Sequence, residues 1–360
     1  MKRATRLATG GKTTLGKTGR RRTNKIALAG SLVAMATLAA GCAGSSPTAA
    51  GSSGSTTGNG GSAAGKTVHF IGYGNTNQWG AYFNSVFEKR LKAADVKLKD
   101  LTTMDAGTAV QNFNQAIADK PDLIVTALLD TKSMAVPIAK AKQAGVPVLV
   151  FDGRPDPKVD GDVLQVVSDN VALGKAAAEN IIEGLKAQGR ESGNVVVITG
   201  TASSLVTQDR MKGFNAEMAT APGYKVIETQ DGNWDPKLSG QIATQLLAKH
   251  SCDKIQAAYG MADYMALPII ASAQQAGCKV GGKNGLIVTS SNCFKAGIDA
   301  IKQGTLYGTA TEDPGTIANQ TAAYVLEYLS GQNPPRKQTV KEERITAANV
   351  DQYAAQCSHA

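Results

Sequence analysis

Beyond its first 66 residues, the 360-residue sequence lacks the local motifs that mark several enzyme classes. From residue 67 onward it contains no Gly-x-Gly-x-x-Gly dinucleotide fingerprint, no Gly-x-Ser-x-Gly nucleophile elbow and no phosphate-binding loop. Histidine is scarce too, and His69, His250 and His359 are far apart in the chain. A metal site needs His, Cys or carboxylates clustered at ligand spacing, which this scatter does not provide. The sequence therefore predicts a protein that is not an enzyme and that holds no metal or cofactor.

Acidic residues are absent from the first 42 positions, which hold nine of the 38 Lys and Arg residues. The rest of the chain has 29 basic residues against 29 acidic ones, so the formal net charge of +9 belongs to the leader. A formally neutral body gives no reason to expect a nucleic-acid partner. A DNA-binding repressor would also need a basic headpiece where this chain has an export signal.

The export signal is predicted over residues 1–41. A basic cluster at residues 20–25 precedes an apolar stretch at residues 26–40, which is shorter than the roughly 20 apolar residues that span a bilayer. The stretch ends in Leu38-Ala39-Ala40-Gly41-Cys42, which resembles the lipobox of bacterial lipoproteins. Leu38 lies four residues before Cys42 instead of the usual three. We interpret Cys42 as a lipidated new N-terminus, and plain secretion with an incidental cysteine is the alternative.

A flexible tether is predicted to follow, so that residues 42–65 comprise the lipidated cysteine and a Gly/Ser-rich segment. Residues 43–65 carry no charge and too little apolar surface to fold. A coil of this length reaches roughly 25 Å. The expected location is outside the cytoplasm, either anchored by lipid to the outer face of the cell membrane or periplasmic. No later segment is apolar enough and long enough to span a membrane.

From Thr67 onward, short apolar runs alternate with amphipathic stretches of helical length. The alternation predicts an α/β fold of two doubly wound parallel-sheet lobes, because some 300 residues are too many for one domain. Strands are expected at residues 68–71, 123–125, 146–151, 195–198, 255–259 and 286–288. Helices are expected at residues 81–94, 109–118, 134–144, 175–188, 209–219, 236–249 and 266–276.

Polar side chains follow the expected strands, where parallel sheets bind their ligands. The two tryptophans of the chain, Trp79 and Trp234, both fall in these loops, beside Asn and Asp residues. Each alone could equally be a core aromatic. Together they indicate a carbohydrate site, because a sugar stacks its C–H faces on aromatic rings and offers its hydroxyls to Asp, Asn and Arg. The expected ligand is small and polyhydroxylated: a pentose, a hexose or a sugar alcohol.

As a set, seven short segments resemble the periplasmic ribose-binding family of solute-binding proteins, the type I periplasmic binding proteins. The segments are Phe151-Asp152, Ser168-Asp169-Asn170, Arg210-Met211-Lys212-Gly213-Phe214, Asn233-Trp234-Asp235, Asp263-Tyr264-Met265-Ala266-Leu267, Gln303-Gly304-Thr305-Leu306 and Glu312-Asp313-Pro314. The resemblance implies two lobes joined by three crossovers, which close on a sugar and deliver it to the membrane permease of an ABC importer. It also implies an N-terminal lobe of residues 66–168 plus 312–336 and a C-terminal lobe of residues 169–311 plus 337–360. We expect a monomer. A lipoprotein that senses the ligand for a membrane receptor or kinase is the alternative.

The resemblance further implies which residues contact the ligand. Asp152 matches the acid that clamps ring hydroxyls, and Arg210 matches the arginine that reaches the ligand from the second lobe. Four positions differ from the ribose binders. Asn292 replaces an Asp, Glu312 replaces a Gln and Ala262 replaces an Asn. Gly153 stands where the family has an Arg, and Arg154 follows one residue later. These differences weaken the case for ribose itself but fit another polyol. The expected ligand-binding residues are Asn77, Trp79, Asp152, Arg154, Arg210, Trp234, Asp263, Asn292 and Glu312.

Four cysteines remain when Cys42 is set aside, an even number in an exported chain. Cys252 precedes one expected strand and Cys278 follows the next helix, so both should lie at the amino-terminal edge of one sheet. Among the three possible connectivities we choose disulfides between Cys252 and Cys278 and between Cys293 and Cys357. Free buried thiols are the alternative.

Overall fold

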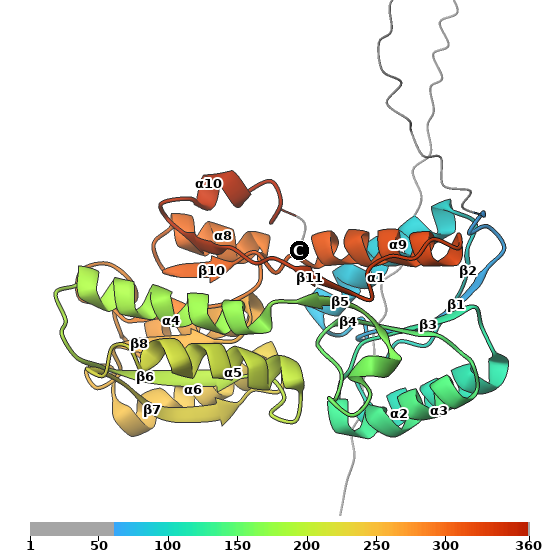
Figure 1. Cartoon of the computed structure of the whole chain (residues 1–360). Coiled ribbons are helices and arrows are strands. Elements are labelled where there is room, and N and C mark those ends of the chain that lie inside the picture. Colours follow the sequence, from blue (N-terminus) through green and yellow to red (C-terminus); the bar gives the residue numbers. More distant parts are fainter. Residues whose placement is uncertain (1–60, 359–360) are drawn as a thin grey trace, which may run out of the picture. The chain divides into compact units, whose positions relative to one another are not determined.

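The computed structural model describes residues 61–358. The predicted export signal, Cys42 and most of the predicted tether therefore lie outside the described residues. Within residues 61–358, no helix is long and apolar enough to cross a membrane. The described chain folds into two α/β lobes, each built on a six-stranded sheet (Figure 1). This architecture confirms the fold class expected from the sequence.

The sheet of the N-terminal lobe is parallel throughout and has the strand order β11-β5-β4-β3-β1-β2. Helices α1 and α9 pack together over one face of this sheet, and α2 and α3 cover the other. The strands are β1 (Thr67–Ile71), β2 (Lys97–Asp100), β3 (Leu123–Thr126), β4 (Val148–Asp152), β5 (Leu164–Ser168) and β11 (Lys337–Val340). The helices are α1 (Gln78–Ala93), α2 (Ala106–Asp119), α3 (Thr131–Gln143), the short 3-10 turn η1 (Asp160–Asp162) and α9 (Pro314–Leu329).

The sheet of the C-terminal lobe has the order β12-β10-β9-β8-β6-β7, and only the β10–β12 pair is antiparallel. In this lobe α4 packs with α5 and α6 packs with α7. The strands are β6 (Gly193–Thr199), β7 (Tyr224–Asp231), β8 (Ala257–Gly260), β9 (Ile287–Thr289), β10 (Gly308–Ala310) and β12 (Arg344–Thr346). The helices are α4 (Asn170–Ala187), α5 (Leu205–Met218), α6 (Pro236–His250), α7 (Asp263–Gln275), α8 (Lys295–Lys302) and α10 (Val350–Tyr353).

The chain passes between the two sheets three times. It leaves the first sheet after β5 and returns after β10, at residues 168–170 and 311–313. The third passage lies later than expected, because β11 pairs in parallel with β5 and extends the first sheet. Residues 337–340 therefore belong to the N-terminal lobe, and the expected boundary after residue 336 is corrected to one after Val340.

Capping side chains begin most of the helices that follow strands. An oxygen of the residue before each helix accepts a backbone N–H from the first turn, which otherwise has no partner inside the helix. The capping residues are Asn77, Asp105, Asp130, Asp169, Ser204, Asp235 and Asp313. The polar residues that follow the strands therefore stabilise helix N-termini at the carboxyl edges of the sheets, in addition to any contact with a ligand.

The structure contains both disulfides of the chosen connectivity. Cys252 and Cys278 join the segments before β8 and after α7, with their Cα atoms 5.4 Å apart. Cys293 and Cys357 join the loop after β9 to the segment after α10, with their Cα atoms 4.8 Å apart. The first bridge braces an edge of the C-terminal lobe, whereas the second bridge reaches the loop that carries Asn292.

Candidate ligand-binding site

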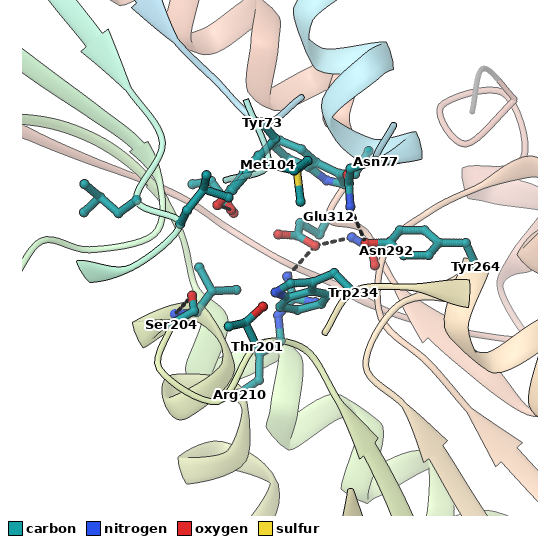
Figure 2. Close-up of a pocket in the computed structure, with 15 residues that line it drawn as sticks. Tyr73, Asn77, Met104, Thr201, Ser204, Arg210, Trp234, Tyr264, Asn292 and Glu312 are labelled. Carbon is teal, nitrogen blue, oxygen red and sulfur yellow. Dashed lines mark hydrogen bonds and ion pairs between the residues drawn. The ribbon is translucent and has the colours of Figure 1, made fainter. Parts of the chain in front are cut away.

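A small cavity lies where loops from the carboxyl ends of both sheets meet (Figure 2). We call it the inner cavity, and its volume is about 40 Å³. Seven of the nine expected ligand-binding residues line it. They are Asn77, Trp79, Asp152, Arg210, Trp234, Asn292 and Glu312. The structure therefore brings seven of the nine residues together around one cavity, and the other two, Arg154 and Asp263, lie outside it.

A stack of aromatic rings holds Trp79 in the wall of the N-terminal lobe. The indole stacks on Phe83 with ring centroids 5.2 Å apart, and Phe83 stacks on Phe151 at 4.3 Å. Trp79 is 5% exposed, and its Nε1–H has no hydrogen-bond partner. A buried N–H without a hydrogen-bond partner destabilises the protein, so a ligand that supplies an acceptor to it would gain binding free energy.

Trp234 forms the facing aromatic wall in the C-terminal lobe. Asn233 and Trp234 both adopt positive φ angles, of 50° and 57°, which side-chain-bearing residues rarely adopt. Thr201 Oγ1 donates to Asn233 Oδ1 at 2.6 Å and helps to hold this turn. Gly200 is required beneath the ring, because a Cβ there would lie 1.9 Å from Cε2 of Trp234. The Arg210 guanidinium lies 5.3 Å from the centroid of the indole, at cation–π distance.

Asp152 ends β4 and turns its carboxylate into the inner cavity. Its φ of 65° is unusual for a residue other than glycine, which indicates a backbone held in place for function. Oδ2 accepts a hydrogen bond from the Tyr73 hydroxyl at 2.8 Å, and Oδ1 has no partner. Burial raises the pKa of Asp152, and the nearby charge of Arg210 opposes that rise. Asp152 and Glu312 also share a side-chain hydrogen bond, which links the two carboxyl groups that line the inner cavity.

Arg210 and Glu312 form a fully buried ion pair, with Nη2 and Oε2 2.5 Å apart. The remaining guanidinium contacts go to protein acceptors, since Nε donates to Asn170 Oδ1 at 2.9 Å and Nη1 donates to the Met261 carbonyl at 2.8 Å. Burial raises the pKa of Glu312 well above its usual range; Arg210 opposes this rise, and the neighbouring Asp152 adds to it. The positive charge of Arg210 is therefore already balanced by protein groups.

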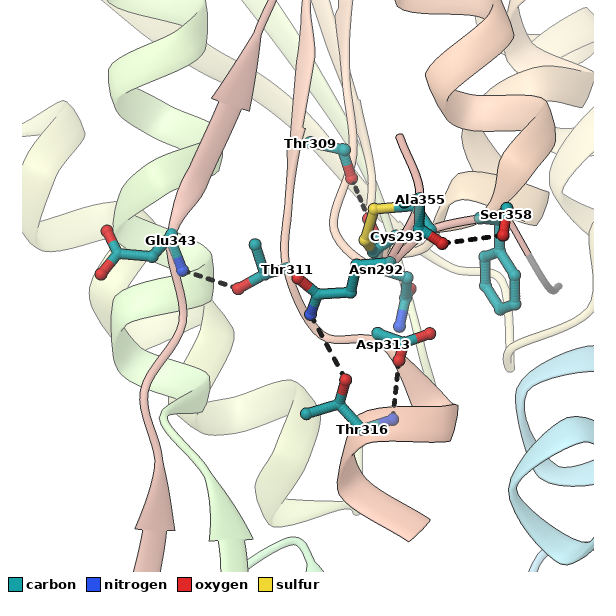
Figure 3. Close-up of a disulfide and its surroundings, with 12 residues drawn as sticks. Asn292, Cys293, Thr309, Thr311, Asp313, Thr316, Glu343, Ala355 and Ser358 are labelled. Atoms are coloured by element: carbon teal, nitrogen blue, oxygen red, sulfur yellow. Dashed lines mark hydrogen bonds between the residues drawn. A yellow bond between two sulfur atoms is a disulfide. The ribbon is translucent and has the colours of Figure 1, made fainter. Parts of the chain in front are cut away.

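Asn292 completes the polar wall. Its Nδ2 donates to Glu312 Oε2, and its Oδ1 has no partner. The residue has a φ of 82°, so its loop must be held from outside the cavity. Thr309 provides part of that support, because its hydroxyl donates to the carbonyl oxygen of Asn292 (Figure 3). The disulfide of the adjacent Cys293 with Cys357 provides another part.

Asp263 does not line the inner cavity, which corrects the expectation that it contacts the ligand. It is fully buried, and both carboxylate oxygens are in use. Oδ1 accepts from Ser290 Oγ at 2.5 Å and lies 2.7 Å from Thr309 Oγ1, and Oδ2 accepts from the Phe294 N–H at 3.0 Å. Burial raises its pKa to about 7, although these donors act in the opposite direction. Asp263 therefore positions the Asn292 loop.

Arg154 is the second correction. It lies outside the inner cavity and forms a bidentate ion pair with Asp209 of α5. Its Nε lies 2.6 Å from Oδ2 of Asp209, and its Nη2 lies 2.9 Å from Oδ1. Arg154 follows β4 in the N-terminal lobe and α5 belongs to the C-terminal lobe, so this pair joins the two lobes directly. Asp209 lies 55 residues away, too far for local spacing to suggest the contact.

Eight further residues line the inner cavity that the sequence analysis did not single out. Two are tyrosines: Tyr73 donates to Asp152, and the Tyr264 hydroxyl accepts from Asn77 Nδ2 at 3.1 Å across the lobes. Tyr264 stands in the quoted segment that begins at Asp263, whereas Tyr73 follows β1 and belongs to none of the quoted segments. The others carry no distinctive motif. The full set is Tyr73, Met104, Leu128, Leu129, Thr201, Ser204, Val206 and Tyr264.

Two lobes that enclose an aromatic and polar cavity define a solute-binding protein. The model of the periplasmic binding protein domain family matches residues 68–333, and the chain belongs to this family. The Fructose import binding protein FruE of Bifidobacterium longum is 25% identical over 292 residues, which cover 79% of this chain and 86% of that protein. The D-ribose/D-allose-binding protein of Pseudomonas aeruginosa is 28% identical over 242 residues, which cover 66% of this chain and 72% of that protein.

Solved structures share the fold. A galactofuranose binding protein matches with a TM-score of 0.74 at 20% identity and covers 81% of this chain and 98% of that one. The Caulobacter myo-inositol binding protein matches with a TM-score of 0.73 at 19% identity and covers 81% of this chain and 96% of that one. Family and fold confirm the predicted class: this is an extracytoplasmic solute-binding protein of the type I periplasmic kind and not an enzyme.

The two disulfides should differ in their effect on binding. Replacing both cysteines of either bridge with Ala should lower the free energy of unfolding by about 3 to 4 kcal/mol, since each closes a long loop. The Cys293→Ala, Cys357→Ala variant should also weaken ligand binding about tenfold, or about 1.4 kcal/mol, because the Asn292 loop loses its brace. Urea denaturation and calorimetric titration measure the two effects. Equal ligand affinities in the two double variants would contradict this role.

The Arg154–Asp209 pair should stabilise the closed lobes, because its two partners belong to different lobes. Arg154→Ala or Asp209→Ala should raise the ligand Kd about two- to fivefold, the range for a partly exposed pair. The effect should shrink at high salt, which screens the pair. Titrations at low and high NaCl test this, with Lys142→Ala as the control because Lys142 pairs with Asp162 inside one lobe. Wild-type affinity in both single variants at low salt would refute the idea.

Proposed function

We propose that this protein captures a neutral sugar or sugar alcohol between its lobes and delivers it to the permease of an ABC importer. The observation that carries the proposal is a set of three buried polar atoms without a hydrogen-bond partner, on residues that line the inner cavity: Trp79 Nε1, Asp152 Oδ1 and Asn292 Oδ1. The two oxygens need hydrogen-bond donors and the indole nitrogen needs an acceptor. A hydroxyl group supplies both, so several hydroxyls on one small molecule satisfy the set.

Charge favours a neutral ligand. Among the described residues that line the inner cavity, Arg210 is the one with a fixed positive charge, and Glu312, Asn170 and Met261 already engage it. The carboxyl groups of Asp152 and Glu312 face the same cavity. A phosphate or carboxylate would meet these acids without a free cation in compensation. A polyol avoids that cost.

The relatives support the same class of ligand. Curated relatives are named for fructose, for ribose and allose, and for galactofuranose. Trp79 and Trp234 offer aromatic surface to the C–H faces of such a molecule. Because the ligand contacts come from both lobes, a bound ligand would favour the closed arrangement of the lobes.

A calorimetric screen of pentoses, hexoses and sugar alcohols tests the proposal. The ligand that binds best should lose roughly 30-fold or more in affinity with Asp152→Ala, which removes a hydrogen bond to a charged group worth about 2 kcal/mol. Asn292→Ala should weaken binding as well. Trp79 and Trp234 are the two tryptophans of the chain, so intrinsic fluorescence should change on binding.

Asp156→Ala serves as the control, because Asp156 follows the same strand and does not line the inner cavity. Its affinity should equal that of the wild type. Undiminished binding to Asp152→Ala and Asn292→Ala would place the ligand elsewhere and overturn the proposal.

We further propose that a lipid on Cys42 anchors the protein to the outer face of the cell membrane. The support is the lipobox-like sequence followed by an uncharged, Gly/Ser-rich segment. Cys42→Ser should release the protein from the membrane fraction and leave ligand affinity unchanged, since residues 68–333 form the matched binding domain. Fractionation of cells followed by immunoblotting measures this. A variant that stays in the membrane fraction would refute the anchor.

A further inference from the structure

We propose that Glu342 is a positioning residue that joins the three crossovers and makes the affinity for ligand depend on pH. Glu342 belongs to the third crossover, residues 341–343, which connects β11 with β12. It does not line the inner cavity, so its effect on binding passes through the crossovers and not through contact with the ligand. The inference rests on the proposed function, because the property that it concerns is the affinity for a sugar.

The side chain of Glu342 contacts both of the other crossovers. Its Oε2 accepts a hydrogen bond from Thr311 Oγ1 of the second crossover at 3.1 Å, and its Oε1 is buried. The same carboxyl group interacts with the side chain of Ser168, where the first crossover begins. Lobes that open and close concentrate their backbone changes in such connecting segments. One carboxyl group therefore lies at the point about which the lobes move.

Backbone hydrogen bonds hold this junction together on both sides of Glu342. The Glu343 N–H donates to Thr311 Oγ1 at 2.8 Å, and the Thr311 N–H donates to the Glu343 carbonyl at 3.0 Å (Figure 3). On the other side, the Asp169 N–H donates to the carbonyl of Val340 at 3.3 Å. The third crossover is thus bonded to the second and to the first, and Glu342 is fixed between the two contacts.

The surroundings of Glu342 disfavour its negative charge. Burial raises its pKa from the ordinary value of 4.5 to about 7, and the charge of Asp152 adds to this rise. Hydrogen bonds to the carboxyl group and the charge of Arg210 act in the opposite direction. Arg210 is already paired with Glu312, whose own pKa is raised in part by Glu342. One buried cation therefore faces three carboxyl groups, and it cannot balance all of them.

The other charged side chains near Glu342 in the crossovers have partners of their own. Asp169 and Asp313 accept backbone N–H groups as the caps of α4 and α9. Ion pairs engage the charged neighbours in the chain, Lys341 with Glu343 and Arg344 with Glu183. The buried groups Asp152, Glu312 and Arg210 are thus the charges that act on Glu342.

The direction of the pH effect follows from the raised pKa of Glu342. Opening of the lobes would let water reach the carboxyl group, so that its pKa returns toward the ordinary value. Closure on a sugar then takes up protons, and it becomes less favourable as the pH rises from about 4.5 to about 7. Above this range Glu342 is ionised in both arrangements, so the loss of affinity is constant. The protein should therefore bind more tightly at about pH 5 than at about pH 8.

Glu342→Gln tests the inference on the full-length protein. The amide removes the charge and keeps an oxygen that can accept from Thr311. D-fructose, D-allose, xylitol and myo-inositol are titrated by calorimetry at about pH 5 and about pH 8, and the tightest binder is used for the comparison. The variant should bind about tenfold more tightly than the wild type at the higher pH and within about twofold at the lower pH, since tenfold corresponds to one pH unit of proton linkage.

Glu343→Gln is the matched control, because Glu343 lies on the same crossover with an exposed side chain. It should follow the wild type at both pH values. Urea denaturation supplies a measurement without sugar. Ionisation of Glu342 with a raised pKa lowers the free energy of unfolding, so Glu342→Gln should stabilise the protein more at about pH 8 than at about pH 5.

The outcomes separate this inference from the proposed function. Equal affinities of the wild type and Glu342→Gln at the higher pH, or weaker binding by the variant at both pH values, would refute the role of Glu342 while sugar binding stands. A change of the same size in Glu343→Gln would trace the effect to the net charge of the segment and would also refute it. Failure of every sugar to bind at both pH values would overturn the proposed function, and with it the effect on affinity.

Discussion

The buried charge of Arg210 is the constraint on which the site and the joining of the lobes depend. Arg210 is 2% exposed and Glu312 is 1% exposed, so each charge relies on the other in place of water. Arg210 comes from α5, Glu312 from the second crossover and Asn170 from the end of the first crossover. One cation thus ties two of the three crossovers to the wall of the ligand cavity. Separating these groups would leave a buried charge unpaired, at a cost of about 3 to 5 kcal/mol. Movement of the lobes must therefore leave this contact intact.

The side chains that carry the three polar atoms without a partner are held in place by rigid neighbours. Trp79 stacks on Phe83, and the Tyr73 hydroxyl bonds to Asp152. Thr309 and Asp263 hold the loop of Asn292. Each support uses one polar or flat surface of the side chain and leaves another free. Because these side chains are already ordered, ligand binding costs little conformational entropy. A small ligand with few contacts can then bind with useful affinity. The buried carboxylate of Asp263 thus holds the loop that carries Asn292 without lining the inner cavity itself.

The sequence predicts the two-lobed fold because buried parallel strands are continuous apolar runs. The same pattern does not predict the edge strands β2 and β7, because most of their side chains are exposed and they lack an apolar run. Strand-end polar residues predict the location of the inner cavity, but the direction of a side chain depends on partners far along the chain. Arg154 turns to Asp209, and Asp263 turns to Ser290 and Thr309, in each case away from the inner cavity.

The bridge from Cys293 to Cys357 has a consequence for the order in which the protein matures. Export through a membrane proceeds along the chain, and Cys357 follows its partner by 64 residues. Disulfides form in oxidising compartments outside the cytoplasm. The Asn292 loop therefore acquires its covalent brace only after the final described helix, α10, has emerged and met an oxidant. A chain still inside the cell would lack this covalent brace, so its Asn292 loop would be held by hydrogen bonds alone.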